Sequence, residues 1–334
     1  MTQRHERPER SAGLGGPDKT GLLVRAGAAV SGWWFAPQPL GRVAALRVLA
    51  YLFIPFDMYL ITYWAPRHAA VPGEFYRPLE VARVLRLPDP TATLVPLGGL
   101  LLVLAAVGAA LLALLAPRIS GADVRRAARL DVLVRALGLA VALLYLWWMV
   151  VAMSYGKVDH DRFAFLVLLF VLPTVAGARL GDRTTTQAAG WGLRAVQVSV
   201  VLTYFLAAIA KIRFGGFGWV NSGTYARAVI RRGSMLVDWT LQVPAVLVAF
   251  QWFTVIFELA SPVLLFLRSE RVRLYLVLGL YGFHAMTFLA LGIAFWPHLV
   301  ALAAFLPLER LRPPAWLGGA DRPEAGATAP EAAA

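Results

Sequence analysis

The residues best able to do chemistry lie in one long apolar run and the turn that follows it. Within residues 191–233, an apolar segment of membrane-spanning length ends on Lys211. A charge on a spanning helix is costly, so a lysine in this place predicts a functional site. A lysine at the end of a span can also extend its amine to the lipid headgroups and have no other role. Its position alone leaves these two interpretations equally open.

Other titratable residues interrupt the apolar runs, and each has a structural alternative. Asp57, which follows Pro55, could pair with an arginine such as Arg213, and Glu258 could pair with Arg194. The remaining candidates are histidines. His284 could be a core histidine bonded to a backbone carbonyl, His160 lies between two aspartates in a short loop, and His298 is expected at the membrane interface. Adjacent residues in a tight loop seldom converge on one ion, so no metal site is predicted.

The segment beyond Lys211 combines arginine, glycine and tryptophan. Arg213 and Trp219 follow within eight residues, and a helix with Arg227 and Arg231 on one face is expected next. An anionic headgroup or a substrate carboxylate could bind there. We therefore predict Asp57, Arg213, Trp219, Arg227 and Glu258 as substrate-binding residues.

The composition indicates an all-α, polytopic membrane protein. Only 15% of the 334 residues are charged, against about 25% in soluble domains, and the apolar residues come in long blocks. We predict eight transmembrane segments, at residues 43–64, 92–116, 130–153, 163–180, 193–212, 243–267, 272–291 and 293–308. The last is short and could be re-entrant. These segments predict a multi-pass protein of the cell membrane with the bilayer as its partner.

Basic residues set the expected orientation. The net charge of +13 is explained by arginine-rich loops under the positive-inside rule, so nucleic-acid binding is not expected. The loops predict that both termini are cytoplasmic. With this orientation, Lys211 and His160 are expected at the outer face of the membrane. Asp57 and His284 are expected at a similar depth in the bilayer. Residues 1–30 and 313–334 are predicted to be disordered tails that flank a membrane domain at residues 31–312.

Four stretches, in order, resemble the HTTM family, the horizontally transferred transmembrane domain that includes vitamin K-dependent gamma-carboxylase. The most specific is YFLAAIAKIRFGGFGWVNSGTYARAV, an aromatic-rich helix that ends in Lys and is followed by Trp and a short helix. The others are ALRVLAYLFIPFDMYL, VIFELASPVLLFLRSERVR and LYGFHAMTFLALGIAFWPHLVALAAF. The acidic residue that follows the family's lysine is replaced here by Arg213 and glycines.

The resemblance implies a catalytic role for three residues. It implies that Lys211 is the base that deprotonates a quinol, such as menaquinol or vitamin K hydroquinone, before reaction with oxygen. It places His160 and His284 beside the same quinone, in an outer-facing cavity formed by the first, fourth, fifth and seventh spans. Lysine acts as a base only in its neutral form, which desolvation favours.

Two classes of function follow from these observations. The first is a quinol-dependent oxygenase or carboxylase-like enzyme. The second is a non-catalytic membrane module that binds a lipid, a quinone or a protein partner, or that takes part in peptide maturation. A transporter is the weakest hypothesis, because the sequence shows no inverted repeat.

Overall fold

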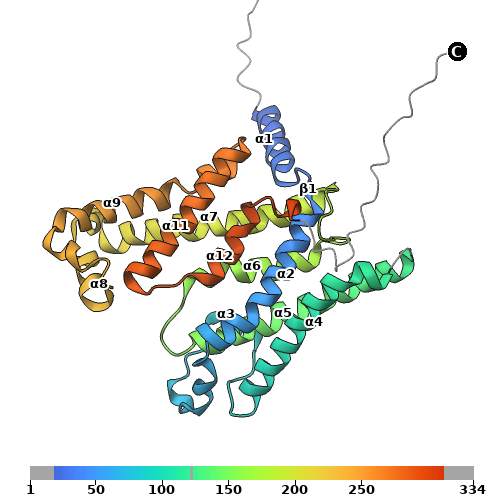
Figure 1. The fold of residues 1–334 in the computed structure, drawn as a ribbon, viewed down its shortest axis with the longest axis horizontal. Coiled ribbons are helices and arrows are strands. Elements are labelled where there is room, and N and C mark those ends of the chain that lie inside the picture. The colour runs from blue at the N-terminus through green and yellow to red at the C-terminus, as the bar shows by residue number, and fades with distance from the viewer. Residues whose placement is uncertain (1–18, 121–122, 312–334) are drawn as a thin grey trace, which may run out of the picture.

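The computed structural model describes residues 19–120 and 123–311, and this part of the chain is almost wholly helical (Figure 1). The two-residue strands β1 (Gln38–Pro39) and β2 (Thr185–Thr186) form one antiparallel pair. The α-helices are α1 (Lys19–Trp34), α2 (Leu40–Phe56), α3 (Glu80–Leu85), α4 (Leu94–Ser120), α5 (Val124–Met153), α6 (Phe163–Val171), α7 (Gln187–Gly215), α8 (Thr224–Arg232), α9 (Pro244–Ala260), α10 (Val263–Phe266), α11 (Glu270–Leu291) and α12 (Trp296–Leu302).

Six helices are long and apolar enough to cross a membrane, which indicates a membrane protein. They cover Leu40–Ile61, Leu94–Pro117, Val124–Met153, Gln187–Gly215, Pro244–Phe266 and Glu270–Leu291. The other two predicted spans are shorter in the structure. Around 163–180, helix α6 ends at Val171 and a 3-10 turn with Pro173 follows, because proline has no N–H to continue the helix. Around 293–308, the apolar helix covers Trp296–Phe305.

The N-terminal prediction needs a correction. Residues 19–30 were expected to belong to a disordered tail, but they lie in α1. This stretch contains enough apolar residues, up to Trp33 and Trp34, to favour a helix at a membrane interface. The rest of that predicted tail, and the predicted C-terminal tail, lie outside the described residues.

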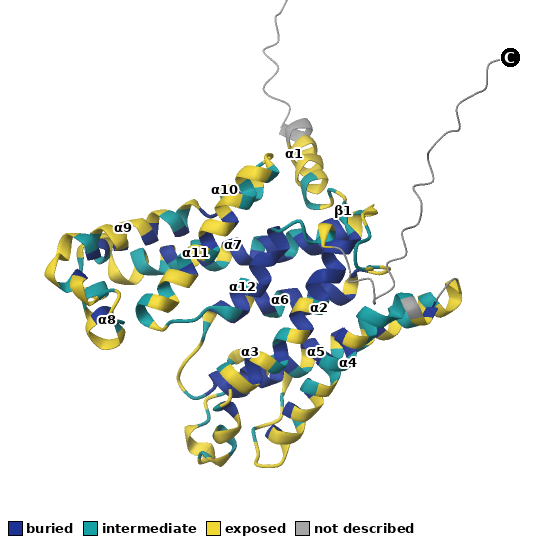
Figure 2. Ribbon diagram, in the orientation of Figure 1, coloured by how far each residue is buried: buried dark blue, intermediate teal, exposed yellow. Residues whose placement is uncertain are grey.

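The core lies where α2, α5, α6, α7 and α12 meet. Buried residues concentrate at the centre of the molecule, whereas α4, α9 and α11 carry many exposed ones (Figure 2). Only 17% of the apolar window of Glu270–Leu291 is buried inside the structure. An apolar helix that buries so little of itself needs lipid around it.

Helix α2 ends in a short π-helical segment, Asp57–Ile61, directly after Pro55. The proline leaves a backbone carbonyl without its helical partner, and π-helical turns are frequent at functional sites. Asp57 is fully buried at the start of this segment. Its backbone carbonyl accepts from both the N–H and the hydroxyl of Thr62.

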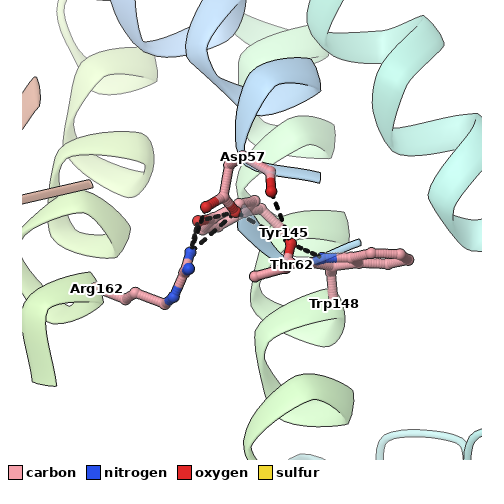
Figure 3. Close-up of polar contacts among 5 residues, drawn as sticks. All are labelled: Asp57, Thr62, Tyr145, Trp148 and Arg162. Atoms are coloured by element: carbon pink, nitrogen blue, oxygen red, sulfur yellow. Dashed lines mark hydrogen bonds and ion pairs between the residues drawn. The ribbon is translucent and has the colours of Figure 1, made fainter. Parts of the chain in front are cut away.

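A buried polar cluster joins α2, α5 and the turn before α6 (Figure 3). The Arg162 Nη1 donates to both carboxylate oxygens of Asp57, at 2.8 and 2.9 Å, and to the hydroxyl of Tyr145 at 2.8 Å. Tyr145 donates to Asp57, and Trp148 donates to Thr62. The expected partner of Asp57, Arg213, was therefore wrong, because the His160–Arg162 turn before α6 brings Arg162 to Asp57.

Removing one member of this pair should be strongly destabilising. Asp57→Ala leaves the Arg162 guanidinium buried without its carboxylate, which costs about 3–5 kcal/mol. Thermal unfolding in detergent should therefore show a large loss of stability. The control is Glu80→Ala, which removes the exposed Glu80–Arg83 pair and should cost less than about 1 kcal/mol. Equal losses in the two variants would contradict a stabilising role for the cluster.

Candidate functional site

A cavity of about 550 Å³ lies among α7, α8, α9 and α11. Residues before α6 and in α12 close it on one side. Its wall is mainly apolar, with Leu247, Phe250, Phe253, Phe283 and Phe295 among the lining residues. The prediction that the first, fourth, fifth and seventh spans form the cavity was correct for the fifth and seventh, α7 and α11. It was wrong for the first span and for the fourth, at residues 163–180, which contribute no lining residue, and the sixth span, α9, lines the cavity instead.

The structure brings four predicted site residues to this cavity: His160, Lys211, Glu258 and His284. The other four lie elsewhere. Asp57 belongs to the buried cluster described above. Arg213 stacks on Phe214, Arg227 is exposed on α8, and Trp219 lies behind Lys211 with its ring centroid 5.8 Å from the amine.

Lys211 and Glu258 form an ion pair in the cavity wall. The Lys211 amine donates to both carboxylate oxygens, at 2.8 and 2.7 Å. The Glu258 side chain is 9% exposed and that of Lys211 is 25% exposed. The two groups are therefore coupled, and a proton that reaches this part of the wall is shared between Lys211 and Glu258.

The register between α7 and α9 creates this pair. The two helices run antiparallel, with the Ser261 hydroxyl donating to the carbonyl of Val201 and the Gln251 amide donating to that of Val220. Glu258 lies between these two contacts and therefore faces Lys211. The predicted partner Arg194 was wrong. Its guanidinium stacks 4.6 Å from the ring centroid of Trp33 and donates to Gln197.

Two histidines and a tyrosine form the other polar part of the wall. Tyr204 and the Nε2 of His284 are 2.7 Å apart. The Nδ1 of His284 and both ring nitrogens of His298 have no hydrogen-bond partner among the described residues. His298 was expected at the membrane interface, but it is 1% exposed and lines the cavity. Buried nitrogens without partners in a cavity wall are suited to bind a ligand.

Sequence reasoning missed Tyr204 and Asp161 as cavity residues. Tyr204 precedes Lys211 by seven residues, which is two helical turns, so the spacing on one helix face was a usable signal. Asp161 gave no such signal, because its burial depends on the packing of the His160–Arg162 turn against α12. Among the described residues, no group of three His, Cys, Asp or Glu side chains could hold a metal ion.

Gln251 fixes α8 over the cavity. Its side-chain oxygen accepts from the Tyr225 N–H, and its amide donates to the carbonyls of Val220 and Ser222. The Tyr225 hydroxyl is 2.6 Å from that of Thr254. These contacts attach the start of α8 to α9, so that Thr224, Tyr225 and Val229 can line the cavity.

Asp161 should make stability depend on pH. Burial raises the pKa of Asp161 to about 6, whereas an unfolded aspartate titrates near about 3.9. The folded protein therefore holds a proton that the unfolded chain has lost, and its stability falls as pH rises from about 4 through 6. The Asp161→Asn side chain cannot ionise, so this variant should lack the pH-dependent part of the free energy of unfolding that Asp161 contributes. At about 1.4 kcal/mol per pKa unit, that part is at most about 3 kcal/mol. Unfolding temperatures of both proteins at pH 4.5 and 7.5 test this, and identical pH dependence would contradict it.

Comparison with protein-family models, curated proteins and solved structures finds no match to this chain. The resemblance to the HTTM family is therefore carried by the four stretches quoted above. A fold alone does not define a function, so the geometry of the cavity must support any activity that is assigned.

Proposed function

We propose that the protein is an HTTM-type membrane enzyme that binds a quinol in this cavity and takes up its proton at the Lys211–Glu258 pair. In this proposal both termini are cytoplasmic, the cavity faces the outer side of the cell membrane, and the two shorter apolar segments complete the eight. One observation carries it. Lys211, Glu258, His284 and His298, from four helices, converge on a single apolar cavity.

The cavity fits an amphipathic ring with polar groups at its two ends. Pockets for small ligands have volumes of about 300–1,000 Å³, apolar walls and a few placed polar groups. The aromatic side chains of Phe250, Phe253 and Phe283 supply such a wall. The side chains of Tyr204, His284 and His298 in the cavity lining supply polar groups for one oxygen of the ring. The Lys211–Glu258 pair is available for the other.

The ion pair defines how this chain would take up a proton. As found, the pair already holds one proton, on Lys211. Transfer of this proton from Lys211 to Glu258 within the pair leaves a neutral amine, which then accepts the proton of a ring hydroxyl, so that Lys211 becomes an ammonium beside a neutral Glu258 carboxyl. The ammonium then faces the newly formed anion and stabilises it, in a site where the apolar wall strengthens this attraction. A quinol bound there would give one proton to the pair and two electrons to dioxygen. With the second ring proton and the proton released again from the pair, the products are a quinone and hydrogen peroxide.

The alternative is a module that binds a lipid or quinone without chemistry, or that serves a protein partner or peptide maturation. The apolar wall fits this function equally well. The Lys211–Glu258 pair distinguishes the enzyme from the binding module, because a protein that only binds its ligand does not need a base.

Lys211→Arg separates binding from chemistry. Arginine keeps the ion pair with Glu258 but does not give up its proton. We expect quinol affinity within a few-fold of wild type and a loss of quinol-dependent oxygen uptake of about 100-fold or more. Titration with a soluble menaquinol analogue in nanodiscs, with oxygen uptake recorded, measures both quantities. Oxygen uptake by Lys211→Arg at the wild-type rate would refute the assignment of Lys211 as the base. Quinol binding without oxygen uptake in the wild type would favour the non-catalytic module.

Filling the cavity should remove binding without disturbing the ion pair. A side chain at Gly282, which lines the cavity, meets no atom within 4 Å at its Cβ. Gly282→Phe should therefore weaken quinol binding by about tenfold or more, since the ring occupies the ligand's volume. Gly108 on α4 has similar free space and lies outside the cavity, so Gly108→Phe is the control. Equal affinity in the two variants would place the ligand elsewhere.

A further inference from the structure

In the part of the chain that the structure describes, three arginines are almost completely buried, and one of them has no carboxylate partner there. Arg42 pairs with Glu309 at 2.9 Å, and Arg162 pairs with Asp57 at 2.8 Å. Arg47, only 1% exposed, has no acidic group within salt-bridge distance among residues 19–120 and 123–311. A buried charge without a counter-charge is costly, so Arg47 calls for an anion.

The protein contacts of Arg47 leave part of its guanidinium free. Its Nη2 donates to the carbonyls of Leu172 and Val175, at the turn after α6. Its Nε has no hydrogen-bond partner in the part of the chain that the structure describes. The nearby carboxylate of Asp131 is already used, since it accepts from the Gly177 N–H and lies 3.8 Å from Arg135.

Arg47 lines a second cavity, of about 440 Å³, that shares no residue with the first. It lies between α2, the end of α4, the start of α5 and residues 176–179, on the opposite side of the molecule from α8 (Figure 1). Small side chains such as Ala44, Ala113 and Ala127 form much of its wall. The exposed Arg179 adds a second positive charge to the lining.

The surroundings of this cavity fit the phosphate of a lipid. Arg125 and Arg126 lie exposed at the start of α5, beside the cavity residues Asp123 and Val124. Arginine binds phosphate through charge-assisted hydrogen bonds, and basic clusters at the ends of spanning helices attract anionic headgroups. The alanine-rich wall offers an apolar surface for the glycerol and the first acyl carbons.

We propose that this second cavity binds the phosphate group of a membrane phospholipid, with the buried Arg47 guanidinium as the inner positive charge and Arg179 as the outer one. This site is independent of the quinol site and of the proposed activity. A soluble phosphate compound would present the same chemistry to Arg47, and the experiment separates the two sources.

The test is binding of short-chain phosphatidylglycerol to the detergent-purified protein, followed by the rise in unfolding temperature and by native mass spectrometry. A ligand that binds only the folded state raises the unfolding temperature. Ala127→Leu, which fills the cavity, should weaken binding by about tenfold or more. Ala136→Leu, on an exposed position of α5 outside the cavity, should bind like wild type. Ala127→Leu is preferred to Arg47→Gln because it keeps the Arg47 bonds to Leu172 and Val175.

Two further binding measurements distinguish a phospholipid from a soluble phosphate compound. Inorganic phosphate that stabilises wild type as strongly as the lipid, but not Ala127→Leu, would support phosphate binding and identify a soluble source. A weak effect of inorganic phosphate beside a strong effect of the lipid would identify the phospholipid. Equal lipid binding by Ala127→Leu and Ala136→Leu would overturn the proposal. So would equal binding of short-chain diacylglycerol, which has no phosphate.

Discussion

A charged side chain inside an apolar helical bundle needs an opposite charge, and this requirement organises the molecule. Arg42 of α2 reaches Glu309 near the C-terminal end of the described chain, and Arg162 reaches Asp57 from the turn before α6. Lys211 of α7 reaches Glu258 of α9. Each pair joins elements that are distant in sequence, so the pairs determine which helices become neighbours. Pairing of this kind selects one arrangement of helices among several that would bury similar apolar area.

The same requirement shapes the candidate site. The Asp57 cluster holds α2 against α5 and keeps it away from the cavity, which is left to α7, α9 and α11. Within that cavity, the ion pair keeps two charges in an apolar wall at a tolerable cost and makes them available to a ligand. The same cavity is lined by Tyr204, His284 and His298, with the Tyr204 hydroxyl 2.7 Å from the His284 Nε2. Two polar groups in an apolar wall suit a ring with two oxygens.

Much of the fold could be predicted from the sequence, because the length of an apolar run is a local property. The expected spans at 43–64 and 272–291 differ by only a few residues from the helices Leu40–Ile61 and Glu270–Leu291. His160, Lys211 and His284, which were expected at similar depth in the membrane, do line one cavity, whereas Asp57, expected with them, does not. The partners of Asp57 and Glu258 were wrong, because the register between two helices depends on contacts such as Ser261 with Val201. His298 was misplaced for the same reason, since its burial comes from the packing of α12 on α6 and α7.

The most direct test of the account is to locate the bound quinol by photolabelling. The protein in nanodiscs would be irradiated with an azido-menaquinone analogue, and the labelled peptides would be identified by mass spectrometry. A quinol bound in the cavity would place labels on residues of α7, α9 and α11, such as Tyr204, Phe253 and Phe283, and excess menaquinone would remove these labels. Labels spread over lipid-facing positions of α4, unaffected by excess menaquinone, would contradict the account.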